Sequence, residues 1–227
     1  MADAGSAMLD KSGAAVLNRN RLETRVPASK PSPTTDVDIA RLKELLGERP
    51  VVLIGMMGAG KTSVGRRLAT LLDWSFVDSD AEIEEAAGMS IPDFFAAHGE
   101  ADFRSGEARV IARLLKEPGQ VLATGGGAFM NPETRDLIRQ AAISVFIKAD
   151  LELLFERVSR RATRPLLQTA DPKGTLARLI EERYPVYEEA DIIVTSADVP
   201  QDRVAGQIAE ALLAHLSAAE PERSERA

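Results

Sequence analysis

Residues 55–62 read Gly55-Met56-Met57-Gly58-Ala59-Gly60-Lys61-Thr62. They fit G-x-x-x-x-G-K-[ST], the spacing of a phosphate-binding P-loop. A phosphate must be surrounded by successive backbone N–H groups, and glycines permit both the close approach and the positive φ angles of such a turn. In a P-loop the lysine, here Lys61, reaches the β- and γ-phosphates of a nucleotide, and the hydroxyl at the position of Thr62 binds Mg²⁺.

The segments on either side of this loop are those that the motif requires. The apolar run 51–54 predicts a buried parallel strand, and residues 63–72 predict a helix with Val64 and Leu68 on its apolar face. The helix N-terminus then points at the phosphates. A glycine-rich turn that matches by chance is the alternative, and this context disfavours it. The sequence therefore predicts a nucleoside triphosphate site at Gly58, Ala59, Gly60, Lys61, Thr62 and Ser63.

Composition excludes several other classes of protein. The chain has 227 residues, 44% of them hydrophobic and 28% charged, which is typical of a soluble globular domain. A net charge of -7 argues against a general nucleic-acid binder. The absence of cysteine excludes disulfides, thiolate zinc sites and a cysteine nucleophile. No apolar run approaches the roughly 20 residues that span a bilayer. We expect a cytoplasmic protein with neither a nucleic-acid nor a membrane partner.

The chain divides into an extension, one domain and a tail. Residues 1–35 lack sustained periodicity and are predicted to be a disordered extension, with an organelle transit peptide as the alternative. Residues 36–217 are predicted to form a single domain, and residues 218–227 a frayed tail.

Short apolar runs alternate with helical patterns throughout the domain. The runs are 51–54, 74–77, 121–123, 144–147 and 192–194, and the helical patterns are 36–46, 63–72, 81–87, 90–98, 103–116, 132–141, 151–161, 175–190 and 204–216. We expect residues 171–174 to form a turn and Pro185 to kink or interrupt its helix. This alternation predicts an α/β fold of three layers (αβα) with a central parallel sheet of about five strands.

Two further strand ends carry residues suited to chemistry. Asp78 and Asp80 follow the second strand, and Gly125-Gly126-Gly127 follow the third. Ligands of such sheets bind beyond the carboxyl ends of the strands, so these residues should converge with the P-loop. One carboxylate can bind Mg²⁺, and the other can orient an acceptor hydroxyl toward the γ-phosphate. The alternatives are a solvated turn in which Asp80 caps a helix, and a merely flexible glycine turn.

A basic run follows the fourth strand and contains Arg157, Arg160, Arg161 and Arg164. A nucleic-acid patch is one interpretation, but the acidic total and the lack of interleaved aromatic residues disfavour it. We favour an arginine-bearing lid over about residues 158–172, which closes on ATP, excludes water and neutralises transition-state charge.

Taken together, these motifs resemble those of the shikimate kinase family of small P-loop kinases, from about residue 51 to residue 216. The landmarks, in order, are Gly58-Ala59-Gly60-Lys61-Thr62, Asp78-Ser79-Asp80, Phe103-Arg104-Ser105-Gly106-Glu107, Gly125-Gly126-Gly127, Arg164-Pro165-Leu166-Leu167 and Arg183-Tyr184-Pro185-Val186-Tyr187. The resemblance implies transfer of the ATP γ-phosphoryl group to the 3-hydroxyl of shikimate, a step toward chorismate and the aromatic amino acids.

The resemblance also implies residue roles in the acceptor half of the site. Asp80 matches the catalytic residue that holds the shikimate hydroxyls. Arg104 and Arg183 match the pair that grips the shikimate carboxylate, and Gly126 matches a backbone contact. Planar guanidinium groups suit a carboxylate, which agrees with this assignment.

In the nucleotide half, Lys61 and Arg164 are implied to be catalytic. Arg164 matches the lid arginine that meets the ATP phosphates, Arg157 matches the one that lies against adenine, and Thr62 and, through water, Asp78 serve Mg²⁺. Which residue of 195–200 contacts adenine stays open. We expect a monomer that binds ATP and shikimate.

Two other functions stay open at this point. One is a related P-loop kinase for another hydroxy acid, such as gluconate. The other is a non-catalytic binding protein that resembles a shikimate kinase, although intact Lys61, Asp80 and Arg104 speak against it.

Overall fold

A computed structural model of the chain describes residues 37–160 and 169–219. Its sheet has the strand order β2-β3-β1-β4-β5, and every neighbouring pair is parallel, as the sequence predicts. The strands are β1 Val51–Ile54, β2 Ser75–Asp78, β3 Gln120–Ala123, β4 Ile143–Lys148 and β5 Ile192–Thr195.

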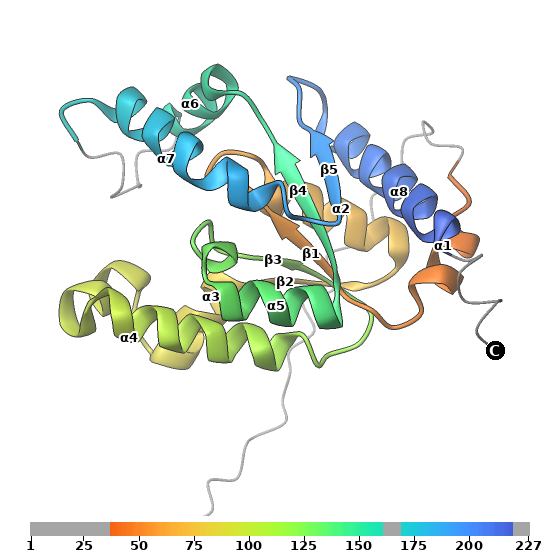
Figure 1. Ribbon diagram of the computed structural model, residues 1–227, viewed down its shortest axis with the longest axis horizontal. Coiled ribbons are helices and arrows are strands. Elements are labelled where there is room, and N and C mark those ends of the chain that lie inside the picture. Colours follow the sequence, from red (N-terminus) through yellow and green to blue (C-terminus); the bar gives the residue numbers. More distant parts are fainter. Residues whose placement is uncertain (1–36, 161–168, 220–227) are drawn as a thin grey trace, which may run out of the picture. The chain divides into compact units, whose positions relative to one another are not determined.

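Helices cover both faces of this sheet, which confirms the three-layer prediction. α1, α2 and α8 pack together on one side, and α4 and α5 lie on the other (Figure 1). α6 and α7 pack against each other beyond the carboxyl end of β4 (Figure 1). The helices are α1 Ile39–Leu46, α2 Lys61–Leu72, α3 Ser79–Ala87, α4 Ile91–Leu114, η1 Ala128–Met130 (a short 3₁₀ helix), α5 Pro132–Ala141, α6 Leu151–Ser159, α7 Pro172–Tyr187 and α8 Gln201–Ala218.

The centre of the sheet is the apolar core. All four residues of β1 and of β3 are buried, since helices cover them on both sides and each strand is therefore an unbroken buried run. α2 lies close on the sheet, because a Cβ added at Gly65 would come within 2.5 Å of Cε2 of Phe76. Since the strands are parallel, their carboxyl ends share one edge, where the P-loop follows β1.

The helices predicted at 90–98 and 103–116 are both present within α4, where they meet at a kink. Ser90 is the N-cap of α4 and accepts a hydrogen bond from the backbone N–H of Asp93, and Pro92 lies in the first turn. Gly99 adopts non-helical angles, φ 80° and ψ 177°, inside this helix. The helix is therefore interrupted at Gly99 and resumes directly after it, so α4 consists of two helices, as the sequence predicts, with the second beginning earlier than residue 103.

The turn predicted at 171–174 is wrong. Asp171 is the N-cap of α7, and its Oδ1 accepts a hydrogen bond from the backbone N–H of Gly174 at 2.9 Å. Residues with turn composition therefore form the first turn of a helix instead. Pro185 lies inside α7, which continues to Tyr187, so it does not interrupt the helix. It lacks only the N–H that would bond to the carbonyl four residues earlier, within the last turns of the helix.

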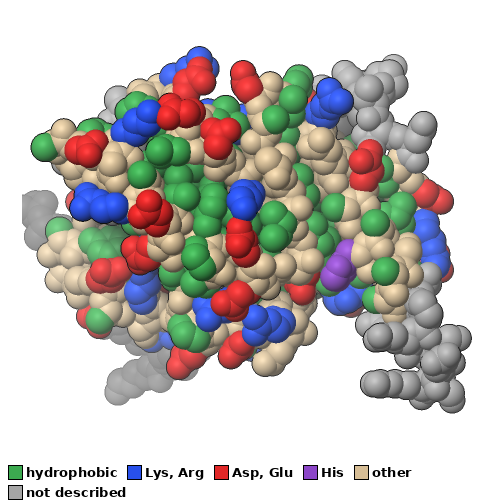
Figure 2. Space-filling model, turned by 45° about the horizontal axis from the view of Figure 1, so that its top comes forward, with side chains coloured by type: hydrophobic (Ala, Val, Ile, Leu, Met, Phe, Trp, Pro, Cys, Tyr) green, Lys and Arg blue, Asp and Glu red, His purple; other side chains and the backbone are tan. Residues whose placement is uncertain are grey.

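Some predictions fall outside the described residues: the extension over residues 1–35, most of the lid including Arg161 and Arg164, and most of the tail. In the parts of the chain that the structure describes, no helix has the length and apolar character needed to cross a membrane. On the face that Figure 2 shows, acidic and basic side chains are interspersed.

Candidate active site

A cleft of about 1260 Å³ lies at the carboxyl edge of the sheet. It brings together residues from the P-loop, the end of β2, α4, the glycine loop after β3, α6 and α7. Of the predicted site residues that the structure describes, Ala59 alone does not line the cleft, because it is buried in the core. The predicted site residues that line the cleft are Gly58, Gly60, Lys61, Thr62, Ser63, Asp78, Asp80, Arg104, Gly126, Arg157 and Arg183.

The P-loop has the backbone that its glycines permit. Gly60 has φ 96° and caps α2, which begins at Lys61, two residues earlier than predicted. A Cβ at Gly60 would lie 2.7 Å from Oε1 of Gln201, so its lack of a side chain also makes room for that amide. Lys61 Nζ donates to the carbonyls of Gly55 at 2.7 Å and Met56 at 3.2 Å. The lysine therefore lies across the loop, at the N-terminus of α2.

Asp78 connects the P-loop helix to the end of β2. Its Oδ2 accepts a hydrogen bond from the Thr62 hydroxyl at 3.0 Å, and its Oδ1 accepts one from the backbone N–H of Asp80 at 3.2 Å. Asp78 is therefore the N-cap of α3, and Asp80 lies in the first helical turn. The capping role considered for Asp80 therefore belongs to Asp78.

The donor set at Thr62 and Asp78 fits Mg²⁺. A hydroxyl and a carboxylate lie within hydrogen-bond distance of each other, and Mg²⁺ prefers such oxygen ligands together with waters and substrate phosphates. Among the described residues, no cluster of three acidic or histidine side chains could hold a metal ion. A bound Mg²⁺ would therefore rely on these two residues, water and nucleotide phosphates rather than on a protein cage.

Asp80 has an unusually basic carboxylate. Burial raises its pKa to about 6, the negative charges of Asp78, Glu107 and Glu84 add to the shift, and Lys61 opposes it. The glycine loop makes room for this group, since a Cβ at Gly125 would lie 2.6 Å from Oδ1 of Asp80. The group is ionised at neutral pH yet basic enough to accept a proton.

The other two glycines of that loop make room for the two arginines. A Cβ at Gly126 would lie 3.2 Å from Nη1 of Arg183, and a Cβ at Gly127 would overlap the guanidinium of Arg104. Three successive glycines thus border a carboxylate and two guanidinium groups that come from α3, α7 and α4. This close approach explains the triple glycine better than turn flexibility does.

The two arginines differ in their partners. Nη1 of Arg104 donates to Oε2 of Glu107 at 2.7 Å, and the side chain of Glu107 is only 3% exposed. Burial raises the pKa of Glu107, and Arg104 opposes that rise. Nε of Arg183 is buried and has no hydrogen-bond partner among the described residues. An unsatisfied buried donor is costly, and such a cost is typical of a functional position.

Arg157 links α6 to the loop after β5. Its Nη1 donates to Oγ of Ser196 at 3.2 Å, and its Nη2 donates to the carbonyl of Ala197 at 3.1 Å. These contacts fix the guanidinium of Arg157, which lines the cleft.

The sequence reasoning gave no role to several residues of the cleft. Glu107 is the last residue of the motif Phe103-Arg104-Ser105-Gly106-Glu107. Its i,i+3 spacing from Arg104 is the signal that could have identified their ion pair. Glu100 has the same kind of signal at i,i+4. Gln201 had none, because it is the first residue of a helix with no motif around it.

Comparison with known proteins agrees with this geometry. A family model described as Shikimate kinase matches residues 57–213. The chain is 58% identical over 183 residues to the shikimate kinase of Rhodopseudomonas palustris, covering 81% of this chain and 90% of that protein. It is 55% identical over 182 residues to the shikimate kinase of Paramagnetospirillum magneticum, covering 79% and 93%.

Solved structures give the same result. The shikimate kinase from Acinetobacter baumannii in complex with shikimate superimposes with a TM-score of 0.72 at 38% identity, covering 76% of this chain and 97% of that chain. The shikimate kinase from Aquifex aeolicus gives a TM-score of 0.64 at 35% identity, covering 72% and 95%. Because the family model and these relatives match most of this chain, it is an enzyme that belongs to the shikimate kinase family.

Proposed function

We propose that this enzyme transfers the γ-phosphoryl group of ATP to the 3-hydroxyl of shikimate, a step toward chorismate and the aromatic amino acids. One observation carries the proposal: Asp80, Arg183 and Arg104 border three successive glycines of one loop, in the same cleft as Lys61. Shikimate has hydroxyls and one carboxylate, which suit a carboxylate and two guanidinium groups respectively. The relatives of this chain are shikimate kinases, and one was solved with shikimate bound.

Each half of the cleft has a defined task in the transfer. The P-loop N–H groups and Lys61 hold the phosphates, and Arg104 and Arg183 hold the acceptor by its carboxylate. Asp80 binds the acceptor hydroxyl, orients it and accepts its proton, as its raised pKa allows. Bound Mg²⁺ neutralises phosphate charge, with Thr62 and, through water, Asp78 as the residues that hold it. Catalysis then consists mainly of positioning and charge neutralisation.

The remaining roles are part of the same proposal. Arg157 lies against adenine, an assignment supported by its place in the cleft lining and its bonds to the loop after β5. Arg164 and the lid over about residues 158–172 close on the phosphates, a role that rests on the sequence motif alone. The monomeric state and the cytoplasmic location likewise stay predictions from the sequence.

A coupled assay of ADP release, with and without shikimate and with gluconate in parallel, tests the function. We expect turnover that depends on shikimate and not on gluconate. Asp80→Asn should lower kcat by about 10²-fold or more, the contribution of a positioned acid–base group. Asp136→Asn, an exposed aspartate on α5, is the matched control. ATP turnover that ignores shikimate would instead support the non-catalytic binding protein, and near-normal kcat in Asp80→Asn would remove Asp80 from its role.

A further inference from the structure

We propose that the carboxylate of Glu100 occupies the edge of Arg104 that the acceptor carboxylate binds, and thereby competes with the acceptor. This inference rests on the proposed function, in which Arg104 is a carboxylate receptor. It adds a residue that sets the affinity for the acceptor.

Arg104 has two carboxylate partners of different character. Nη1 bonds to Oε2 of Glu107 at 2.7 Å, and that side chain is 3% exposed. On the other edge, Nη2 and Nε both point to Oε1 of Glu100, at 3.2 and 3.4 Å. The side chain of Glu100 is 70% exposed. The buried carboxylate of Glu107 therefore cannot separate from Arg104 without leaving a buried charge unpaired, whereas the exposed side chain of Glu100 can rotate into solvent.

The edge that Glu100 occupies is the one best suited to a ligand. Nε and Nη2 are parallel donors that bind both oxygens of a carboxylate in a bidentate pair. Glu100 instead presents a single oxygen to both donors, at distances longer than those of a good charge-assisted bond. An incoming carboxylate with two free oxygens would form the stronger pair and displace it.

Arg104 does not need Glu100 for its orientation. The short bond to Glu107 holds one end of the guanidinium, and the bare backbone of Gly127 lies directly against it. Glu100 is also a lining residue of the cleft, immediately after the kink at Gly99. Its negative charge therefore opposes an anionic ligand in addition to its direct contact with Arg104.

Steady-state kinetics of Glu100→Gln and Glu100→Asp test the proposal. Glu100→Gln removes the charge and should lower the KM for shikimate about two- to fivefold, the size expected for release of one exposed ion pair. Glu100→Asp keeps the charge but shortens the side chain, so it should lower this KM by a smaller factor. The KM for ATP should change less than twofold in both.

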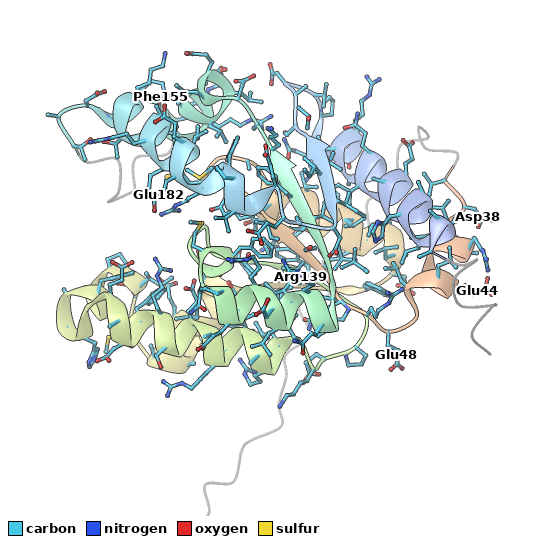
Figure 3. The ribbon with its side chains drawn as sticks, in the orientation of Figure 1. Asp38, Glu44, Glu48, Arg139, Phe155 and Glu182 are labelled. Atoms are coloured by element: carbon cyan, nitrogen blue, oxygen red, sulfur yellow. The ribbon has the colours of Figure 1, made fainter. Side chains whose placement is uncertain are left out.

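The control is Glu44→Gln, which breaks an exposed Arg–Glu pair of 2.7 Å on α1. Figure 3 shows Glu44 on α1, on the opposite side of the view from the first half of α4. The Glu44→Gln variant should have unaltered KM values for both shikimate and ATP. A KM for shikimate that is unchanged or higher in Glu100→Gln would overturn the inference and mark Glu100 as a residue that positions Arg104. Wild-type enzyme without shikimate-dependent turnover would overturn the proposed function instead.

Discussion

At the scale of single residues, Asp80 shows how the site opposes the stability of the fold. Burial and the nearby carboxylates of Asp78, Glu107 and Glu84 all disfavour its ionised form, and only Lys61 favours it. The same surroundings raise its pKa toward the range useful for accepting a proton at neutral pH. A residue selected for folding alone would not be charged at this position.

Asp80→Asn should therefore make the protein more stable at neutral pH. The folded-state pKa of about 6 lies above the ordinary value of 3.8, so protonation favours the fold and stability is lost as pH rises through 6. An uncharged amide avoids this loss, which predicts a gain of about 1–3 kcal/mol in the free energy of unfolding at pH 7. Urea denaturation at pH 7 and pH 4 measures it. The gain should shrink at pH 4, where Asp80 itself is largely protonated, and an equal gain at both values would refute the electrostatic cause.

At the scale of elements, the loop after β5 and the end of α6 form one unit, at the end of the cleft that we propose for the nucleotide. Arg157 of α6 bonds to both Ser196 and Ala197, and Ser196 is buried. The sequence pattern predicted each element but not this link between them. These two hydrogen bonds fix the position of the loop relative to Arg157, although the loop has no recognisable sequence motif.

Ser196→Ala should weaken the binding of ATP and not of shikimate. The change removes one hydrogen bond to Arg157, which leaves the bond to the carbonyl of Ala197 and a less ordered guanidinium. We expect a KM for ATP about two- to fivefold higher, the effect of losing one such bond of about 0.5–1 kcal/mol. Initial-rate kinetics with each substrate varied in turn gives the answer. A raised KM for shikimate alone would contradict the assignment of this loop to the nucleotide.

Sequence predicted the elements better than their boundaries. The strands were predicted from apolar runs in the sequence. For β1, the four apolar residues that are buried in the structure were sufficient for the prediction. Helix starts failed where an aspartate acts as a cap, at Asp78 and Asp171, since an Asp followed by small or turn-forming residues also fits a loop. The two helices on either side of Gly99 were predicted correctly, since glycine disrupts a helical pattern, and only the start of the second helix was placed too late.

At the scale of the whole molecule, the two halves of the site differ in how local they are. The P-loop is continuous in sequence, between β1 and α2, so its motif alone predicts phosphate binding. The proposed acceptor half combines Asp80, Arg104 and Arg183 from three helices with a glycine loop, and no spacing rule joins residues so far apart. Only the family resemblance placed Arg104 beside Arg183 before the structure did. Glu107 and Glu100 have only their i,i+3 and i,i+4 spacing from Arg104 as a signal, and Gln201 has none.

If the cleft has two separable halves, ligands should stabilise the protein through different residues. A ligand at 100 times its Kd adds about 2.7 kcal/mol, which raises the Tm of a domain of this size by roughly 5–10 °C. Mg²⁺–ADP and shikimate, added separately, avoid turnover. Lys61→Met should abolish most of the shift given by Mg²⁺–ADP and keep that of shikimate, and Arg183→Ala should do the reverse.

Differential scanning fluorimetry measures these shifts. The wild type and the two variants are each measured without ligand, with Mg²⁺–ADP and with shikimate. We expect the crossed pattern because Lys61 bonds to the P-loop carbonyls of Gly55 and Met56, whereas Nη1 of Arg183 lies at Gly126 in the glycine loop. Each variant is the folding control for the other, since retention of one shift shows an intact cleft. If either variant lost both shifts while keeping the wild-type Tm without ligand, the halves would be coupled through the glycine loop that both border, rather than independent.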